Sequence, residues 1–218
     1  MKQSLTSKIL FIGFIAFSLS ACQSMYYGAM EKVGVHKRDI LVDRVEEAKE
    51  SQEEAKEQFK SALEKYQHVL NLEKTDLQDK YEQINAEYET SKEAADEVTG
   101  RINAIESVAE ALFDEWMEEL NLYSNAELKR QSKQKLNATR NRYAQLMRAM
   151  RKAESKMQPV VSALQDQSLF LKHNLNAQAI SSLKGELKTI QTNVSRLIKE
   201  MEKSIKESEA FIAQLEKN

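Results

Sequence analysis

The residue with the most distinctive chemistry in this chain is Cys22, its only cysteine. It follows Leu19, Ser20 and Ala21 at the end of a short apolar run. A thiol can form a stable thioether to a diacylglyceryl group, and two or more acyl chains, such as palmitate, hold a protein firmly to a membrane. The sequence therefore predicts lipidation at Cys22, which leaves no thiol for disulfides, metals or redox chemistry.

The other reactive side chains form no catalytic or metal-binding pattern. The three histidines, His36, His68 and His173, are scattered and lack the Glu-x-x-His repeat of a di-iron bundle. Glu64 and His68 share a helix face, but chance alone accounts for one such pair in a chain with 34 acidic residues. A phosphate-binding glycine-rich loop and a serine nucleophile motif are absent from the sequence. We predict that the protein is not an enzyme and has no metal site and no cofactor.

The first 21 residues are typical of a secretory signal peptide. Lys2 and Lys8 form a positive segment, residues 9–17 are apolar, and small residues precede Cys22. The apolar run is shorter than the ~20 residues that a membrane span needs. The motif at Cys22 resembles a bacterial lipobox, so we expect cleavage before this residue. The alternative is an uncleaved anchor with an incidental cysteine. Gln23 stands where an aspartate favours inner-membrane retention, so the pattern favours the outer membrane of a Gram-negative cell.

The composition of the remaining chain indicates long helices. After removal of Lys2 and Lys8, 30 basic and 34 acidic residues remain, a formal charge of −4. This charge gives no drive toward nucleic acid, which we exclude as a partner. The whole sequence has one proline and five glycines, which are too few for a fold rich in turns. A charged fraction of 30% with abundant Ala, Glu, Lys and Leu is typical of coiled coils and long helices.

Apolar residues recur at heptad spacing along most of the chain. We expect a lipidated tether at residues 22–35 and an all-α domain at residues 36–218, with helices at about 36–70, 76–121, 125–173 and 177–217. Three or four antiparallel helices should form an elongated, coiled-coil-like bundle, because none can bury its apolar stripe alone. The clearest seam contains Leu183, Leu187, Ile190, Val194 and Leu197.

The connection between the first two helical segments has two interpretations. The heptad series of residues 36–70 and 76–121 are one residue out of step, and Thr75 or Asp76 could cap a new helix, with Gln78 completing a capping box. This favours a hairpin. A single continuous helix with a skip in its register is the alternative. Further along, Ser124 and Glu127 form a second capping box, and Asn176 is placed to cap the last helix.

Two clusters could bind a partner. Residues 76–119 contain 14 acidic and three basic side chains, whereas residues 127–156 contain ten basic and two acidic ones. We expect these oppositely charged helices to lie side by side. In the alternative, Arg148 and Arg151 belong to a face that binds an anionic glycan. The second cluster is His173, Asn174 and Asn176, which either cap backbone groups or form a partner-binding corner.

Four segments resemble an uncharacterised family of proteobacterial lipoproteins, catalogued as domain of unknown function 2959. They are GVHKRDILVDRV at 34–45, AEALFDEW at 109–116, MRAMRKAE at 147–154 and FLKHNLNA at 170–177. The resemblance extends over nearly the whole mature chain. It implies a helical lipoprotein, and it brings no activity or catalytic residues.

These patterns lead to one functional expectation and one alternative. We expect a lipid-anchored bundle that faces the periplasm, is held to the membrane through Cys22, and has a structural or scaffolding role in the cell envelope. The alternative is a regulatory adaptor that binds one specific envelope complex through an exposed helical seam. The sequence leaves the oligomeric state open, since heptad positions serve contacts within and between molecules alike.

Overall fold

The computed structural model describes residue 30, residues 34–71 and residues 76–217, which form four long helices without strands. The helices are α2 (Lys37–Asn71), α3 (Leu77–Glu119), α4 (Ala126–His173) and α5 (Ala177–Glu216). Their bounds differ by at most two residues from those expected from the sequence. The expected signal peptide and most of the expected tether, including Cys22, lie outside the described residues.

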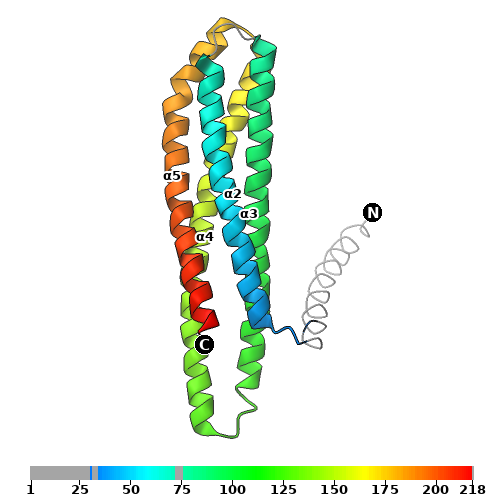
Figure 1. Ribbon diagram of the computed structural model, residues 1–218, viewed down its shortest axis with the longest axis vertical. Helices are drawn as coiled ribbons and strands as arrows, with labels where there is room; N and C mark the ends of the chain where they lie inside the picture. Colours follow the sequence, from blue (N-terminus) through cyan, green and yellow to red (C-terminus); the bar gives the residue numbers. More distant parts are fainter. Residues whose placement is uncertain (1–29, 31–33, 72–75, 218) are drawn as a thin grey trace, which may run out of the picture.

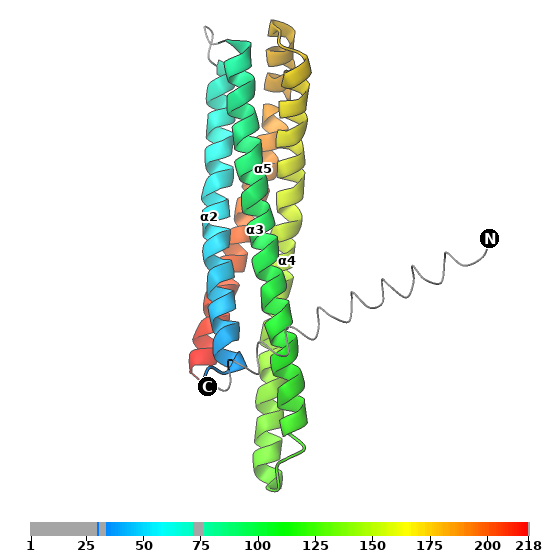
Figure 2. The ribbon, with the colours of Figure 1, turned by 90° about the vertical axis from the view of Figure 1, so that its right-hand side faces the viewer.

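The helices form one elongated antiparallel bundle, which confirms the all-α expectation (Figures 1 and 2). α2 packs against α3 and α5, and α4 packs against the same two helices, so that α2 and α4 lie diagonally across the core. The longest helix, α4, has 48 residues and is ~72 Å long at 1.5 Å per residue. None of the described helices is long and apolar enough to cross a membrane.

α2 and α3 form a hairpin, and the alternative of one continuous helix is excluded. Three ion pairs join the two helices: Lys37 to Glu115 at 3.1 Å, Glu47 to Arg101 at 2.7 Å, and Lys65 to Glu87 at 2.5 Å. Residue numbers rise along α2 as they fall along α3, which is the register of an antiparallel pair. Residues 72–75, including Thr75, are outside the described part of the chain.

The predicted heptad seams form most of the core. Among the side chains buried there, 5% exposed or less, are Leu41, Val45, Phe59, Ile102, Leu164, Val194 and Leu197. Gln52 occupies an apolar position of the α2 seam, is fully buried, and has no hydrogen-bond partner for its side-chain amide within the described bundle. One seam assignment is wrong: Leu175 is 43% exposed because the chain leaves α4 before reaching it. Leu187, like Ile180 and Ile212, is half-buried and packs against the core.

Polar caps define three helix starts. Asp76 accepts a hydrogen bond from the Gln78 backbone N–H at 2.7 Å, and Asn176 accepts one from the Ala179 N–H at 3.0 Å. The prediction that Ser124 caps α4 is wrong by one residue. The cap is Asn125, whose side-chain oxygen accepts hydrogen bonds from two backbone N–H groups. Asn and Ser are equally favoured at the N-cap position. Glu127 instead pairs with the Arg130 side chain at 2.6 Å.

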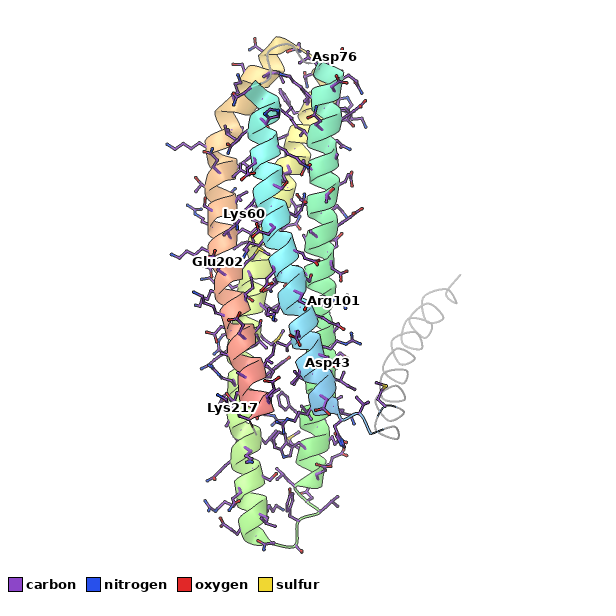
Figure 3. All side chains as sticks on the ribbon, in the orientation of Figure 1. Asp43, Lys60, Asp76, Arg101, Glu202 and Lys217 are labelled. Atoms are coloured by element: carbon purple, nitrogen blue, oxygen red, sulfur yellow. The ribbon has the colours of Figure 1, made fainter. Side chains whose placement is uncertain are left out.

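The two ends of the bundle differ. At the entry end, where α2 begins and α5 ends, the α3–α4 hairpin extends beyond the other two helices (Figures 1 and 2). In Figure 3 the hairpin continues past Asp43 of α2 and Lys217, the residue that follows α5. At the far end, α2 and α5 cover α3 and α4 up to the connections between helices.

Candidate functional site

A cleft of about 610 Å3 lies at the entry end, where α3 and α4 pass the first turn of α2 and the last turn of α5. Residues from all four helices and the α3–α4 loop line it, among them Arg38, Trp116, Tyr123, Leu128, Lys135 and Leu215. Its lining therefore combines apolar and aromatic groups with charges of both signs, since Glu115 and Glu119 also face it. Such a surface suits an amphipathic group, with an apolar part to bury and a polar part to leave in water.

Trp116 connects the two helices that form the deep part of this cleft. Its indole Nε1–H donates a hydrogen bond to the Ser132 hydroxyl of α4 at 2.8 Å. The sequence pattern places Trp116 in the core seam of α3, and the structure shows it half-buried at the edge of that seam. This bond fixes the orientation of the indole ring. It also uses the only hydrogen-bond donor that the indole has.

An aromatic cluster lies one helical turn deeper. The Phe113 and Tyr143 rings meet edge to face with centroids 5.4 Å apart, and the Arg140 guanidinium lies 5.3 Å from the Phe113 centroid. Burial, together with the nearby Glu106 carboxylate, raises the pKa of the Tyr143 phenol to about 12. A phenol with this pKa stays protonated at neutral pH, so the cluster provides packing and a cation–π contact and no ionised base.

Arg151 joins α4 to α3 as the charge pattern predicts. Its guanidinium donates to the Glu106 carboxylate, with Nε to Oε1 at 3.1 Å, and to the Asn103 side-chain oxygen at 2.7 Å. It also pairs with Glu154 of its own helix at 2.8 Å. The hydrogen bond to Glu106 is the largest cause of the raised pKa of Arg151. This residue is therefore committed to contacts within the bundle.

Arg148 does not share that role, which corrects the prediction of one basic face directed at α3. It is exposed in a shallow groove between α4 and α5, beside Lys152, Lys203 and Glu207. Lys152 pairs there with Glu200 of α5 at 2.7 Å. Within the described bundle, Arg148 makes no hydrogen bond or ion pair. One helical turn separates the two arginines, and α4 directs them to different neighbours.

The corner between α4 and α5 contains the other predicted cluster. The Asn174 side-chain amide donates to the Phe170 backbone carbonyl at 2.9 Å, and Asn176 caps α5. Both asparagines therefore serve backbone groups, as the capping interpretation predicts. His173 ends α4 with an exposed side chain, and near it Leu169 and Leu175 are 48% and 43% exposed.

The residues considered as metal ligands do not converge. Glu64 and His68 are both exposed on α2, and His36 precedes that helix. No group of three or more histidine, cysteine or acidic side chains with metal-binding geometry occurs in residues 34–71 and 76–217. Cys22, the predicted lipidation site, lies outside these ranges, so its chemistry stays a prediction.

The cleft itself is the feature that sequence reasoning missed. Heptad analysis assigns Leu112, Trp116 and Leu215 to seams, and it does not indicate that two helices end before the other two. The uncharged segment from Leu120 to Ala126 could have indicated a special surface at this end, because such a run is unusual in a chain with 30% charged residues.

Comparison with known proteins identifies a family. A family model matches residues 26–215 and therefore includes every described helix except the last residue of α5. No curated protein and no solved structure matches the chain. The chain thus belongs to the family described as Protein of unknown function (DUF2959).

Proposed function

We propose that this protein is a lipoprotein of the Gram-negative cell envelope, anchored through Cys22 to the inner leaflet of the outer membrane, with a structural and non-catalytic role in the periplasm. The observation that carries the proposal is the position of the only cysteine. It follows a segment with all the parts of a signal peptide, and α2 begins 15 residues later.

The bundle geometry supports a structural role. Four long helices with a continuous core make a stiff rod, and the chain enters that rod at one end. An anchored rod of this kind can hold its far end several nanometres from the lipid, since α4 alone is ~72 Å long. Spacing or bracing envelope components requires such stiffness and no reactive groups.

The test of the anchor is Cys22→Ser in cells that are fed a labelled fatty acid. The variant loses the label and accumulates as an unprocessed precursor, because serine offers no thiol for thioether formation. Ser24→Ala, which leaves the cysteine in place, is the matched control and keeps both label and processing. A Cys22→Ser protein of mature size that is labelled and membrane-bound would overturn the lipoprotein assignment.

The sorting of the anchored protein has its own test. Gln23→Asp introduces the residue that favours inner-membrane retention after the lipidated cysteine. On separated membranes, the wild-type protein fractionates with the outer membrane and the variant with the inner one. Equal distribution of the two proteins contradicts the outer-membrane assignment and leaves the lipid anchor intact.

A second candidate function is a regulatory adaptor, and the exposed apolar residues of the α4–α5 corner favour it. Leu169, Phe170 and Leu175 form an apolar group there at the end of the bundle farthest from the chain entry. A photocrosslinking side chain placed at position 175 in cells discriminates the two candidates, with position 199 on α5 as the control. One stoichiometric protein adduct specific to position 175 supports the adaptor. General adducts to wall or membrane from both positions support the scaffold.

A further inference from the structure

The tip of the α3–α4 hairpin has an unusual surface for this chain. Residues Leu120 to Ala126 contain no charged side chain, although 30% of the sequence is charged. Leu122 is 83% exposed, and Met117, Tyr123 and Leu128 are each exposed by 41% or more. Exposed apolar groups gathered at one place mark contact surfaces more often than scattered ones do. We call Met117, Leu122, Tyr123 and Leu128 the hairpin tip.

The hairpin tip is the outermost part of the entry end. Arg142 lies opposite Glu207, with 3.8 Å between their charged atoms, so the last residue of α5, Glu216, is level with Lys133 of α4. Residues 126–132 of α4 therefore project beyond α5 by ~10 Å at 1.5 Å per residue. Both ribbon views show this projection beyond the start of α2 and the end of α5 (Figures 1 and 2).

The length of the preceding chain decides which surface lies near this tip. Cys22 and Lys37, the first residue of α2, are 15 residues apart, and fully extended residues span at most ~3.6 Å each, so a lipid on Cys22 lies within ~54 Å of the start of α2. The membrane that holds this lipid is thus within reach of the entry end, where the hairpin tip is the part of the bundle that projects farthest.

The side chains around the tip suit the boundary between lipid and water. Tyr123 has an apolar body and a polar handle, and such side chains collect at the level of lipid headgroups. Glu118 and Glu119 precede the uncharged segment 120–126, and Glu127, Lys129 and Arg130 follow it, so charge of both signs begins where this segment ends. This arrangement limits insertion to the tip.

We propose that the hairpin tip inserts into the headgroup–acyl boundary of the membrane that holds Cys22, giving the rod a second, non-covalent contact with lipid. The inference rests on the proposed lipid anchor. Tethering raises the effective concentration of the tip at the bilayer to the millimolar range. The tip therefore stays inserted for much of the time even when its own affinity for lipid is weak. Two contacts fix the tilt of the bundle, which a single lipid anchor leaves free.

The experiment uses the lipidated protein with Leu122→Cys, labelled with an environment-sensitive fluorophore. The introduced thiol is unique because lipid occupies that of Cys22. The matched control is Leu175→Cys, at an exposed leucine in the connection at the far end. Both proteins are reconstituted into vesicles of phosphatidylethanolamine and phosphatidylglycerol, with and without brominated acyl chains. The label at position 122 shifts to the blue and loses most of its emission with brominated lipid, and the label at position 175 does neither.

The possible failures are distinguishable by flotation of the same samples. If the protein floats with the vesicles and the label at position 122 behaves like that at 175, the anchor stands and tip insertion is overturned. If the label at position 122 shifts to the blue but is not quenched by brominated lipid, and the introduced thiol at this position crosslinks two copies of the protein, the tip contacts a second chain. That result also overturns lipid insertion. If the processed protein does not float, the lipid anchor itself fails.

Discussion

The entry end and the far end of the bundle are built differently. At the far end, the Tyr66 hydroxyl of α2 reaches across the core and donates to the Gln167 side-chain oxygen of α4 at 3.0 Å and to the Leu183 carbonyl of α5 at 3.2 Å. Burial, with a contribution from Glu186, raises the pKa of this phenol well above its ordinary value, so it remains a donor. At the entry end, one hydrogen bond from the Trp116 indole to the Ser132 hydroxyl joins the two helices that continue.

The two ends therefore differ in what they contribute: the far end stabilises the fold, and the entry end leaves surface for contacts with other molecules. Three helices share one buried hydroxyl at the far end, so a change there disturbs the whole fold. At the entry end the chain leaves a cleft and an exposed apolar tip, which contribute little to folding and are available for contacts. Packing thus concentrates stability in the four-helix part and leaves the two-helix extension free for binding.

Truncation of core leucines should give the largest contrast. Leu183 is 2% exposed, and its replacement by alanine removes buried contacts from the far end, at a cost of ~2–5 kcal/mol. Leu128→Ala at the hairpin tip, where the side chain is 51% exposed, changes the free energy of unfolding little. Thermal unfolding measures both, and Lys199→Ala on the exposed face of α5 is the neutral control. Similar melting temperatures for the two leucine variants would remove the distinction between the ends.

A smaller effect is expected from removal of one hydroxyl. Tyr66→Phe leaves the buried Leu183 carbonyl and the part-buried Gln167 side-chain oxygen without their shared donor, so the free energy of unfolding falls by ~1–2 kcal/mol. Tyr123→Phe, the same change at the exposed tip, serves as the control and has no measurable effect. Denaturant titration of both variants provides the comparison. A Tyr66→Phe protein as stable as wild type would show that the far end does not depend on this bond.

The smallest predicted effect concerns the two arginines. Arg151→Glu replaces an attraction to Glu106 by repulsion between helices, whereas Arg148→Glu changes an exposed groove residue. Because the Arg151 side chain is partly exposed, its pair contributes at most ~1 kcal/mol. Salt screens it over a Debye length of ~8 Å at physiological ionic strength. Melting curves at low and high salt should show a salt-dependent loss for Arg151→Glu only, and equal behaviour of both variants would contradict the division of the basic face.

The sequence predicted the helices well because heptad spacing and capping residues act locally. Asp76 and Asn176 cap helices where expected, and the seams around Val194 and Leu197 are buried. Prediction was weaker for the degree of burial. Leu187 belongs to the heptad series and packs against the core but is only half-buried, since periodicity gives the face of a residue and not how completely the neighbouring helices cover it.

The candidate site was less predictable for the same reason. The cleft exists because α2 starts level with Glu115 and α5 ends before the hairpin turns, and no local pattern encodes that offset. The different neighbours of Arg148 and Arg151 likewise follow from the rotation of α4 about its axis. Net charge along a segment indicates which helices attract each other, and it does not assign single residues to partners.

Hydrogen exchange, followed by mass spectrometry along the chain, is the most direct test of a stable four-helix part with a loosely held two-helix extension. A chain that begins at Gln23 keeps all four described helices and is suitable for the measurement. Amides of the helical residues 116–119 and 130–132, which lie in the extension, should exchange far faster than those of residues 84–109 and 146–171, because only two helices protect them. Equal protection of the hairpin and the four-helix core would contradict the account.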